Sequence, residues 1–156
     1  MNTITYRIAE EADIDYVVEA RLQFLTELDG PQTPELVQEL KLSLSAYFQK
    51  ALNKTYFCWL AVSGNELAGT GCLVLREQAG GFRNPSGKMG YVMSMYTRPA
   101  YRRKGISSAI LDLLIATGRE KGIRAFELHA TSAGEAVYKK YGFKIHNEST
   151  YRIFYH

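Results

Sequence analysis

Seven consecutive apolar residues, Tyr56–Val62, constrain the fold more than any other part of this 156-residue chain. The run is rich in aromatic residues, so we expect a β-strand there and not a helix. A strand without polar positions must be covered on both of its faces. The run therefore predicts a central strand of an α/β domain, with helices on both faces of its sheet.

Two helices are predicted before this strand from apolar residues at helical spacing. The first follows a short strand at Tyr6–Ile8, is capped by Asp13 and ends at Leu28–Pro31. The second begins at Thr33-Pro34-Glu35, which combines a capping residue, a proline at the first helical position and an acid in the first turn. It extends to Ala51.

The chain after the central strand alternates between strands and helices. A returning strand is expected at Glu66–Arg76, where Gly69 and Gly71 indicate a bulge, and a further strand at Tyr91–Thr97 follows the polar loop Gly80–Gly87. The later elements are a helix from Ile106 to Gly122, a strand at Ala125–Thr131, a short helix opened by a capping box at Ser132–Glu135 and ended by Gly142, and strands at Phe143–Ile145 and Thr150–Tyr155. This order predicts one α/β domain with a mixed sheet over residues 1–156.

Composition excludes several classes of protein. The net charge of +3 does not describe a polycation, and no apolar stretch near the acidic N-terminus fits a secretory signal or a membrane span. Cys58 and Cys72 lie in strand-like runs, which indicates reduced thiols in a cytoplasmic protein. The three histidines have no metal-ligand spacing, so no metal site is expected.

The segment Tyr91–Ser107 is the most informative for function. It predicts a strand that passes through a basic turn, Arg102-Arg103-Lys104-Gly105, into an amphipathic helix. Unpaired N–H groups at a helix start attract anions, and Gly105 lets a phosphate approach the backbone. Taken alone, such a turn is more often a solvent-facing helix start, and it fits neither a Walker loop nor a dinucleotide fingerprint.

Two motifs in order resemble a known family. Arg102–Ser107 after Thr97-Arg98-Pro99 resembles motif A of the GNAT superfamily of acetyl-CoA-dependent N-acetyltransferases, with Ser107 in place of Gly or Ala and Thr97 in place of Val. Val137–Phe143 resembles the family's second signature, and Tyr6–Asp13 is similar to its usual start. The resemblance covers nearly the whole chain and implies a GNAT-like fold, in which two strands of the mixed sheet splay apart.

The resemblance also implies the roles of individual residues. The acyl donor is acetyl-CoA, and its contacts are assigned to Met95, Tyr96, Thr97, Arg102, Arg103, Lys104, Gly105, Ile106, Ser107 and Ser108. Tyr138 matches the tyrosine that protonates the departing CoA thiolate. Direct transfer through a ternary complex to a primary amine of a small molecule or peptide is the implied reaction. Read without the family pattern, Tyr138 is as often a packed aromatic residue as a catalytic one.

The base that deprotonates the acceptor amine stays open. Some family members use a glutamate at the position of Tyr91, which cannot act as a base here. The alternatives are Glu27, Asp29, Glu77, Glu127, His129 and a chain of water molecules. Each of these side chains is more often an ordinary solvated group.

The sequence also allows functions other than catalysis. A GNAT-like module that binds CoA for regulation or interaction, without turnover, fits the same motifs. Nucleic-acid binding through Arg98, Arg102–Lys104 and Lys139-Lys140 is disfavoured by the low net charge and the lack of a recognition module. Homodimers are common in the family, and Tyr151–Tyr155 could supply an edge strand. The acceptor's identity does not follow from the sequence.

Overall fold

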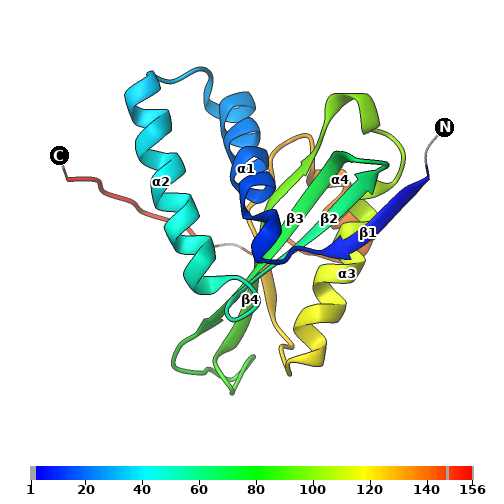
Figure 1. Cartoon of the computed structure of the whole chain (residues 1–156). Helices are drawn as coiled ribbons and strands as arrows, with labels where there is room; N and C mark the ends of the chain where they lie inside the picture. The colour runs from blue at the N-terminus through cyan, green and yellow to red at the C-terminus, as the bar shows by residue number, and fades with distance from the viewer. Residues whose placement is uncertain (1–2, 147, 156) are drawn as a thin grey trace.

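A computed structural model describes residues 3–146 and 148–155 and contains a five-stranded sheet in the order β1-β2-β3-β4-β5 (Figure 1). The strands are β1 (Ile4–Ile8), β2 (Tyr56–Ser63), β3 (Glu66–Glu77), β4 (Lys88–Thr97) and β5 (Phe126–Leu128), and the α-helices are α1 (Ile14–Asp29), α2 (Pro34–Ala51), α3 (Ile106–Glu120) and α4 (Glu135–Tyr141). The first four strands pair antiparallel, whereas β5 pairs parallel with β4. The predicted mixed sheet is confirmed.

Two apolar cores lie on the two faces of the sheet. Alternate residues of β2 point to opposite sides: Tyr56, Cys58 and Leu60 join a core beneath α1 and α2, and Phe57 and Ala61 join a core beneath α3. Figure 1 shows α1 and α2 on one side of the sheet and α3 on the other. The run Tyr56–Val62 is thus an interior strand covered on both faces, as predicted. Within the described residues, no helix combines the length and apolar character needed to cross a membrane.

Glycines in β3 let α3 approach the sheet closely. A Cβ atom on Gly71 would lie 2.4 Å from Met95 Sδ and 2.5 Å from a methyl carbon of Ile110. The strand register also shifts on both sides of this segment, between Ala61 and Val62 of β2 and between Thr70 and Cys72 of β3. The predicted irregularity is therefore confirmed, and helix packing explains why the position is a glycine.

The strands β4 and β5 pair only briefly and then separate. Their register runs from Gly90 opposite Phe126 to Val92 opposite Leu128. β5 is much shorter than the strand predicted at Ala125–Thr131, and the last residues of β4, Tyr96 and Thr97, pair with β3 alone. This confirms the expected splay, which leaves an open edge beside the start of α3.

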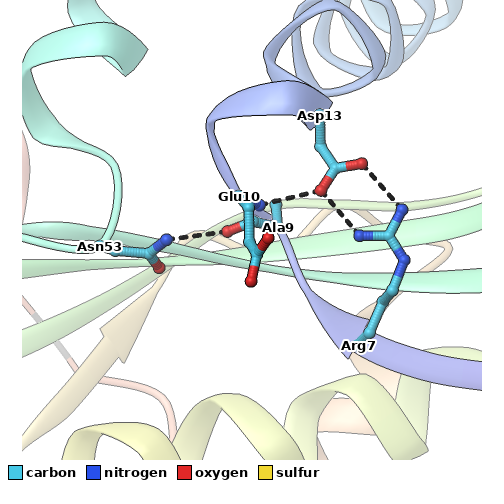
Figure 2. Close-up of polar contacts among 5 residues, drawn as sticks. All are labelled: Arg7, Ala9, Glu10, Asp13 and Asn53. Carbon is cyan, nitrogen blue, oxygen red and sulfur yellow. Dashed lines mark hydrogen bonds and ion pairs between the residues drawn. The ribbon is translucent and has the colours of Figure 1, made fainter.

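Asp13 does not cap α1 through its side chain. It precedes the helix, but its carboxylate accepts hydrogen bonds from Arg7 Nη1 and Nη2, at 2.7 and 2.8 Å, and from the Glu10 N–H at 2.9 Å (Figure 2). Asn53 fixes the same region by donating to the Ala9 carbonyl at 2.9 Å. The buried carboxylate thus ties β1 to the turn before α1, and the sequence prediction of a helix cap was wrong because an arginine offers stronger, charge-assisted bonds.

The starts of α2 and α4 differ in how well local sequence predicts them. The Thr33 hydroxyl accepts the Leu36 N–H at 3.3 Å, so the predicted cap of α2 is confirmed. The predicted capping box of α4 is wrong, because its N-cap is Gly134, which has no side chain to accept a bond. The Thr131 carbonyl accepts the N–H groups of Gly134 and Glu135 instead, at 3.0 and 3.1 Å.

The two C-terminal strands predicted at Phe143–Ile145 and Thr150–Tyr155 do not form in the described residues. Phe143 instead donates its N–H to the Tyr138 carbonyl at 3.0 Å and closes the end of α4. The last described segment extends away from the sheet in Figure 1, and Tyr151 is 92% exposed. A strand-like pattern needs a partner strand to be realised, and β5 with three residues offers little edge.

Candidate active site

A pocket of about 450 Å³ opens where β4 separates from β5. It is lined by Phe24, Glu27, Met95, Tyr96, Thr97, Tyr101, Arg102, Arg103, Gly105, Ile106, Ser107, Ser108, Thr131, Ala133, Gly134, Val137 and Tyr138. Nine of the ten residues expected to contact acetyl-CoA are among them, together with the expected catalytic tyrosine. Lys104 is the exception, and its Nζ lies 5.5 Å from the centroid of the Tyr101 ring.

The turn before α3 presents backbone N–H groups to the pocket. Arg103 and Gly105 adopt left-handed conformations, with φ of 64° and 76°. The hydrogen-bond ladder of α3 begins when Ala109 donates to the Gly105 carbonyl at 3.1 Å, so the N–H groups of residues 106–108 have no acceptor within the helix. A Cβ atom on Gly105 would meet nothing within 4 Å, which leaves open space for an anion against these groups.

Side chains of β4 and of the turn fix one another. Thr97 and Ser107 share a hydrogen bond of 3.2 Å between their hydroxyls, and Arg102 Nε donates to the Thr97 carbonyl at 2.9 Å. Arg102 therefore orders the backbone at the pocket rim. The same threonine and serine depart from the usual residues of motif A, and their bond gives both departures a structural role.

Glu27 joins α1 to this assembly. Its Oε1 accepts from the Tyr96 hydroxyl and its Oε2 accepts from Arg102 Nη2, both at 2.8 Å. Burial alone would raise the pKa of Glu27, but the hydrogen bonds from Tyr96 and Arg102 and the Arg102 charge hold it below its usual value. We call these three residues the Glu27 clamp. A carboxylate held in this way is a weak base, so Glu27 is a positioning group and a poor proton acceptor.

Tyr138 reaches the pocket from the middle of α4. Its ring packs edge-on against Phe143, with 6.1 Å between centroids, and a Cβ atom on Gly134 would lie 3.0 Å from its ring. Burial raises the pKa of Tyr138, so its hydroxyl keeps its proton at neutral pH. Val137, its neighbour, also lines the pocket.

The remaining candidate bases lie outside the pocket lining. Asp29, Glu77, Glu127 and His129 are not among the residues that form it. The His129 ring instead packs edge-on against Tyr91, with 5.6 Å between centroids. The structure therefore brings Glu27 alone of the five candidate side chains to the pocket.

The two cysteines lie apart from the pocket. Cys58 and Cys72 are directly opposite each other in the β2–β3 hairpin, with their sulfur atoms 3.1 Å apart, and both are free thiols. Both are fully buried among apolar residues. They line no part of the pocket.

Two residues of α1 near this site belong to no sequence motif. Phe24 lines the pocket and packs edge-on against Tyr96, with 6.4 Å between centroids. Arg21, one turn earlier, donates from Nη1 to the Ser94 hydroxyl at 2.9 Å. The sequence signal for both is the recurrence of Arg21, Phe24 and Glu27 at every third position, which places neighbouring members of this set close together on the helix surface.

Comparisons with known proteins identify the family. The model of the Acetyltransferase (GNAT) family matches residues 22–143. The chain therefore belongs to the GNAT acetyltransferase family, whose acyl donor is acetyl-CoA.

Individual relatives agree with this assignment. A predicted acetyltransferase from Clostridium acetobutylicum, solved with acetyl-CoA, is 30% identical, with 97% of this chain and 96% of that chain covered and a TM-score of 0.87. A GCN5-related N-acetyltransferase from Ralstonia eutropha JMP134 has the same fold at 22% identity, with 97% and 99% covered and a TM-score of 0.82. The uncharacterized N-acetyltransferase YedL of Escherichia coli K12 is 32% identical over 100 residues, which span 61% of this chain and 57% of that protein.

Proposed function

We propose that this chain is a cytoplasmic N-acetyltransferase that moves an acetyl group from acetyl-CoA directly to a primary amine of a small molecule or peptide. The observation that carries the proposal is the convergence of Tyr138, the last residues of β4 and the left-handed turn before α3 on one pocket. A CoA-binding module without turnover would have no need of a tyrosine hydroxyl at that place. The free thiols of Cys58 and Cys72 suit a reducing compartment.

The turn before α3 holds the phosphates of the donor in this proposal. The N–H groups of residues 106–108 supply the hydrogen bonds, and the positive end of the α3 dipole adds to them. The open edge of β4 at Met95–Thr97 offers backbone groups to the amide-containing arm of the donor, in the manner of an added strand. These contacts direct the thioester toward Tyr138.

Tyr138 acts as the general acid. The amine nitrogen attacks the thioester carbonyl carbon, the C–S bond breaks, and the Tyr138 hydroxyl gives its proton to the departing sulfur. An ordinary phenol has a pKa near 10 and a thiol near 8.5, and burial raises the Tyr138 pKa further, so this proton transfer is uphill on its own and must accompany the breaking of the C–S bond. Direct transfer is supported by the position of both cysteines outside the pocket.

The acceptor amine loses its proton to water in this scheme. Glu27 is the one candidate base in the pocket lining, and its carboxylate is occupied by the Tyr96 hydroxyl and Arg102. A free alkyl amine with a pKa near 10.4 is mostly protonated at pH 7, so the rate should rise with pH through the neutral range.

Replacement of Tyr138 by phenylalanine tests the assignment. Tyr138→Phe keeps the ring against Phe143 and removes only the hydroxyl. We expect kcat to fall about 10²-fold, while the thermal stabilisation by acetyl-CoA is unchanged. The assay follows release of free CoA over a panel of amines, with the product identified by mass spectrometry.

Tyr141→Phe is the matched control, because Tyr141 lies in the same helix, is 42% exposed and does not line the pocket. It should retain wild-type kcat. Wild-type turnover by Tyr138→Phe across the pH range would rule out the general-acid role. Acetyl-CoA binding without CoA release for any amine would favour the regulatory module instead.

A further inference from the structure

Arg21 lies on α1 outside the residues that line the pocket. It stands three residues before Phe24 and six before Glu27, on the side of the helix that faces β4. Those two residues face Tyr96, whereas Arg21 faces Ser94. Because the donor pocket ends at Met95 on this strand, Arg21 stands just beyond the end that the acceptor must occupy.

The charge of Arg21 has no carboxylate partner. The side chain is half-buried and donates to Ser94, a neutral hydroxyl at a kink where φ is 54°. Within residues 3–146 and 148–155, it forms no ion pair. A guanidinium without an anionic partner keeps its paired N–H donors available for an oxyanion.

A second guanidinium lies nearby on the same side of the sheet. Arg76 Cζ is 4.0 Å from the centroid of the Tyr91 ring, and Arg76 likewise has no ion pair among the described residues. Burial raises the pKa of Tyr91, and the charges of Arg76, Arg152 and Arg21 all oppose that rise. The charge of Glu127 acts on the Tyr91 pKa in the opposite direction to the three arginines.

We infer that the acceptor is a small amine that carries an oxyanion, a carboxylate or a phosphate, which Arg21 and Arg76 bind. This inference rests on the proposed acetyl transfer and names its substrate class. A guanidinium binds either oxyanion through paired hydrogen bonds, and the binding is strong where water is partly excluded. Arg21 sits next to the end of the donor pocket, so it would hold the oxyanion close to the amine that attacks.

Matched pairs of amines test this inference and separate the two sources of the oxyanion. Each α-amino acid is compared with its carboxamide, and each amino sugar with its 6-phosphate. For the amines whose oxyanion the site binds, we expect kcat/KM of the wild type to be about 10- to 100-fold higher for the charged member, because its KM is lower. Preference for carboxylates over carboxamides, or for phosphates over free sugars, identifies which oxyanion is bound.

Three variants and one control assign that preference to the arginines. Arg21→Gln should remove most of the preference for the charged member, and Arg21→Lys should restore part of it. Arg76→Gln, at an exposed position, should weaken the preference by a smaller factor. Arg119→Gln, in the last turn of α3 and outside the pocket, should leave it intact.

The outcomes separate this inference from the proposed transfer. Turnover of neutral amines with no preference for their charged partners would overturn the inference and leave the transferase standing. An unchanged preference in both Arg21→Gln and Arg76→Gln would also overturn it. If no amine is turned over, saturation-transfer NMR can measure binding of the same pairs to the CoA-loaded protein. Binding of the charged members that depends on Arg21 would support the oxyanion site. Equal binding of the charged and neutral members would refute it.

Discussion

Gly105 offers a sharp test of the donor site, because Gly122 provides a matched control at the other end of the same helix. The two glycines have φ of 76° and 81°, and an added Cβ atom meets nothing within 4 Å at either. A side chain at such a φ costs about 1–2 kcal/mol in stability. For a domain of this size, that lowers Tm by about 2–8 °C. Gly105→Val and Gly122→Val should therefore be destabilised similarly without ligand.

Acetyl-CoA should separate the two variants. At a concentration of about 100 times Kd, it stabilises the wild type by about 2.7 kcal/mol, or about 5–11 °C in Tm. Gly122→Val should show the same rise. Gly105→Val should show none, since its side chain fills the space where a phosphate would meet the helix N–H groups. The assay is a thermal melt with and without acetyl-CoA, and equal rises in both variants would refute the phosphate site.

Three further predictions concern the fold. Asp13→Asn should cost about 2 kcal/mol at pH 7, since it weakens charge-assisted bonds to a buried group. The Arg7 hydrogen bonds hold the pKa of Asp13 below its usual value near 4, so the contribution of Asp13 to stability is full above about pH 4 and is lost as the pH falls below it. The stability difference between wild type and Asp13→Asn in urea melts should therefore narrow at low pH. A difference that does not change with pH would contradict this prediction. Gly71→Ala should lower stability in a urea titration by about 1–3 kcal/mol, because the added methyl group would overlap Met95 and Ile110 of α3. No loss of stability would show that α3 shifts freely to make room. Thr33→Ala should cost about 1 kcal/mol of stability through loss of a helix cap, whereas Thr33→Ser should keep most of that stability in the same titration.

Local sequence predicted the parts of this fold that depend on neighbouring residues. The start of α2 follows from Thr33 and Pro34, which are adjacent in the chain, and the burial of β2 follows from its own composition. The strands expected near Phe143 and Tyr151 failed because pairing depends on an available edge elsewhere in the sheet. Asp13 failed as a cap for the same kind of reason, since its partner Arg7 belongs to another element.

In the candidate site too, features set by neighbouring residues were predictable and features set by distant residues were not. The motif predicted the turn around Gly105, because a left-handed glycine before a helix is encoded within a few residues. The Glu27 clamp joins positions 69 and 75 residues apart in the chain, and the bond from Arg21 to Ser94 spans 73. No periodicity or spacing within the sequence indicates such contacts, which arise only when α1 is laid on the sheet.

The Glu27 clamp has a consequence for how the two substrates influence each other. It fastens the helix that carries Arg21 to the turn that presents N–H groups at the start of α3. If the acceptor binds at Arg21 as proposed, a ligand that shifts α1 also strains or relieves that turn, and the free energies of binding the donor and the acceptor are then coupled. Such coupling is reciprocal: whatever factor the donor imposes on the affinity for the acceptor, the acceptor imposes on the affinity for the donor. A change of acceptor through mutations in α1 should therefore alter the donor affinity as well, as long as the Glu27 clamp is intact.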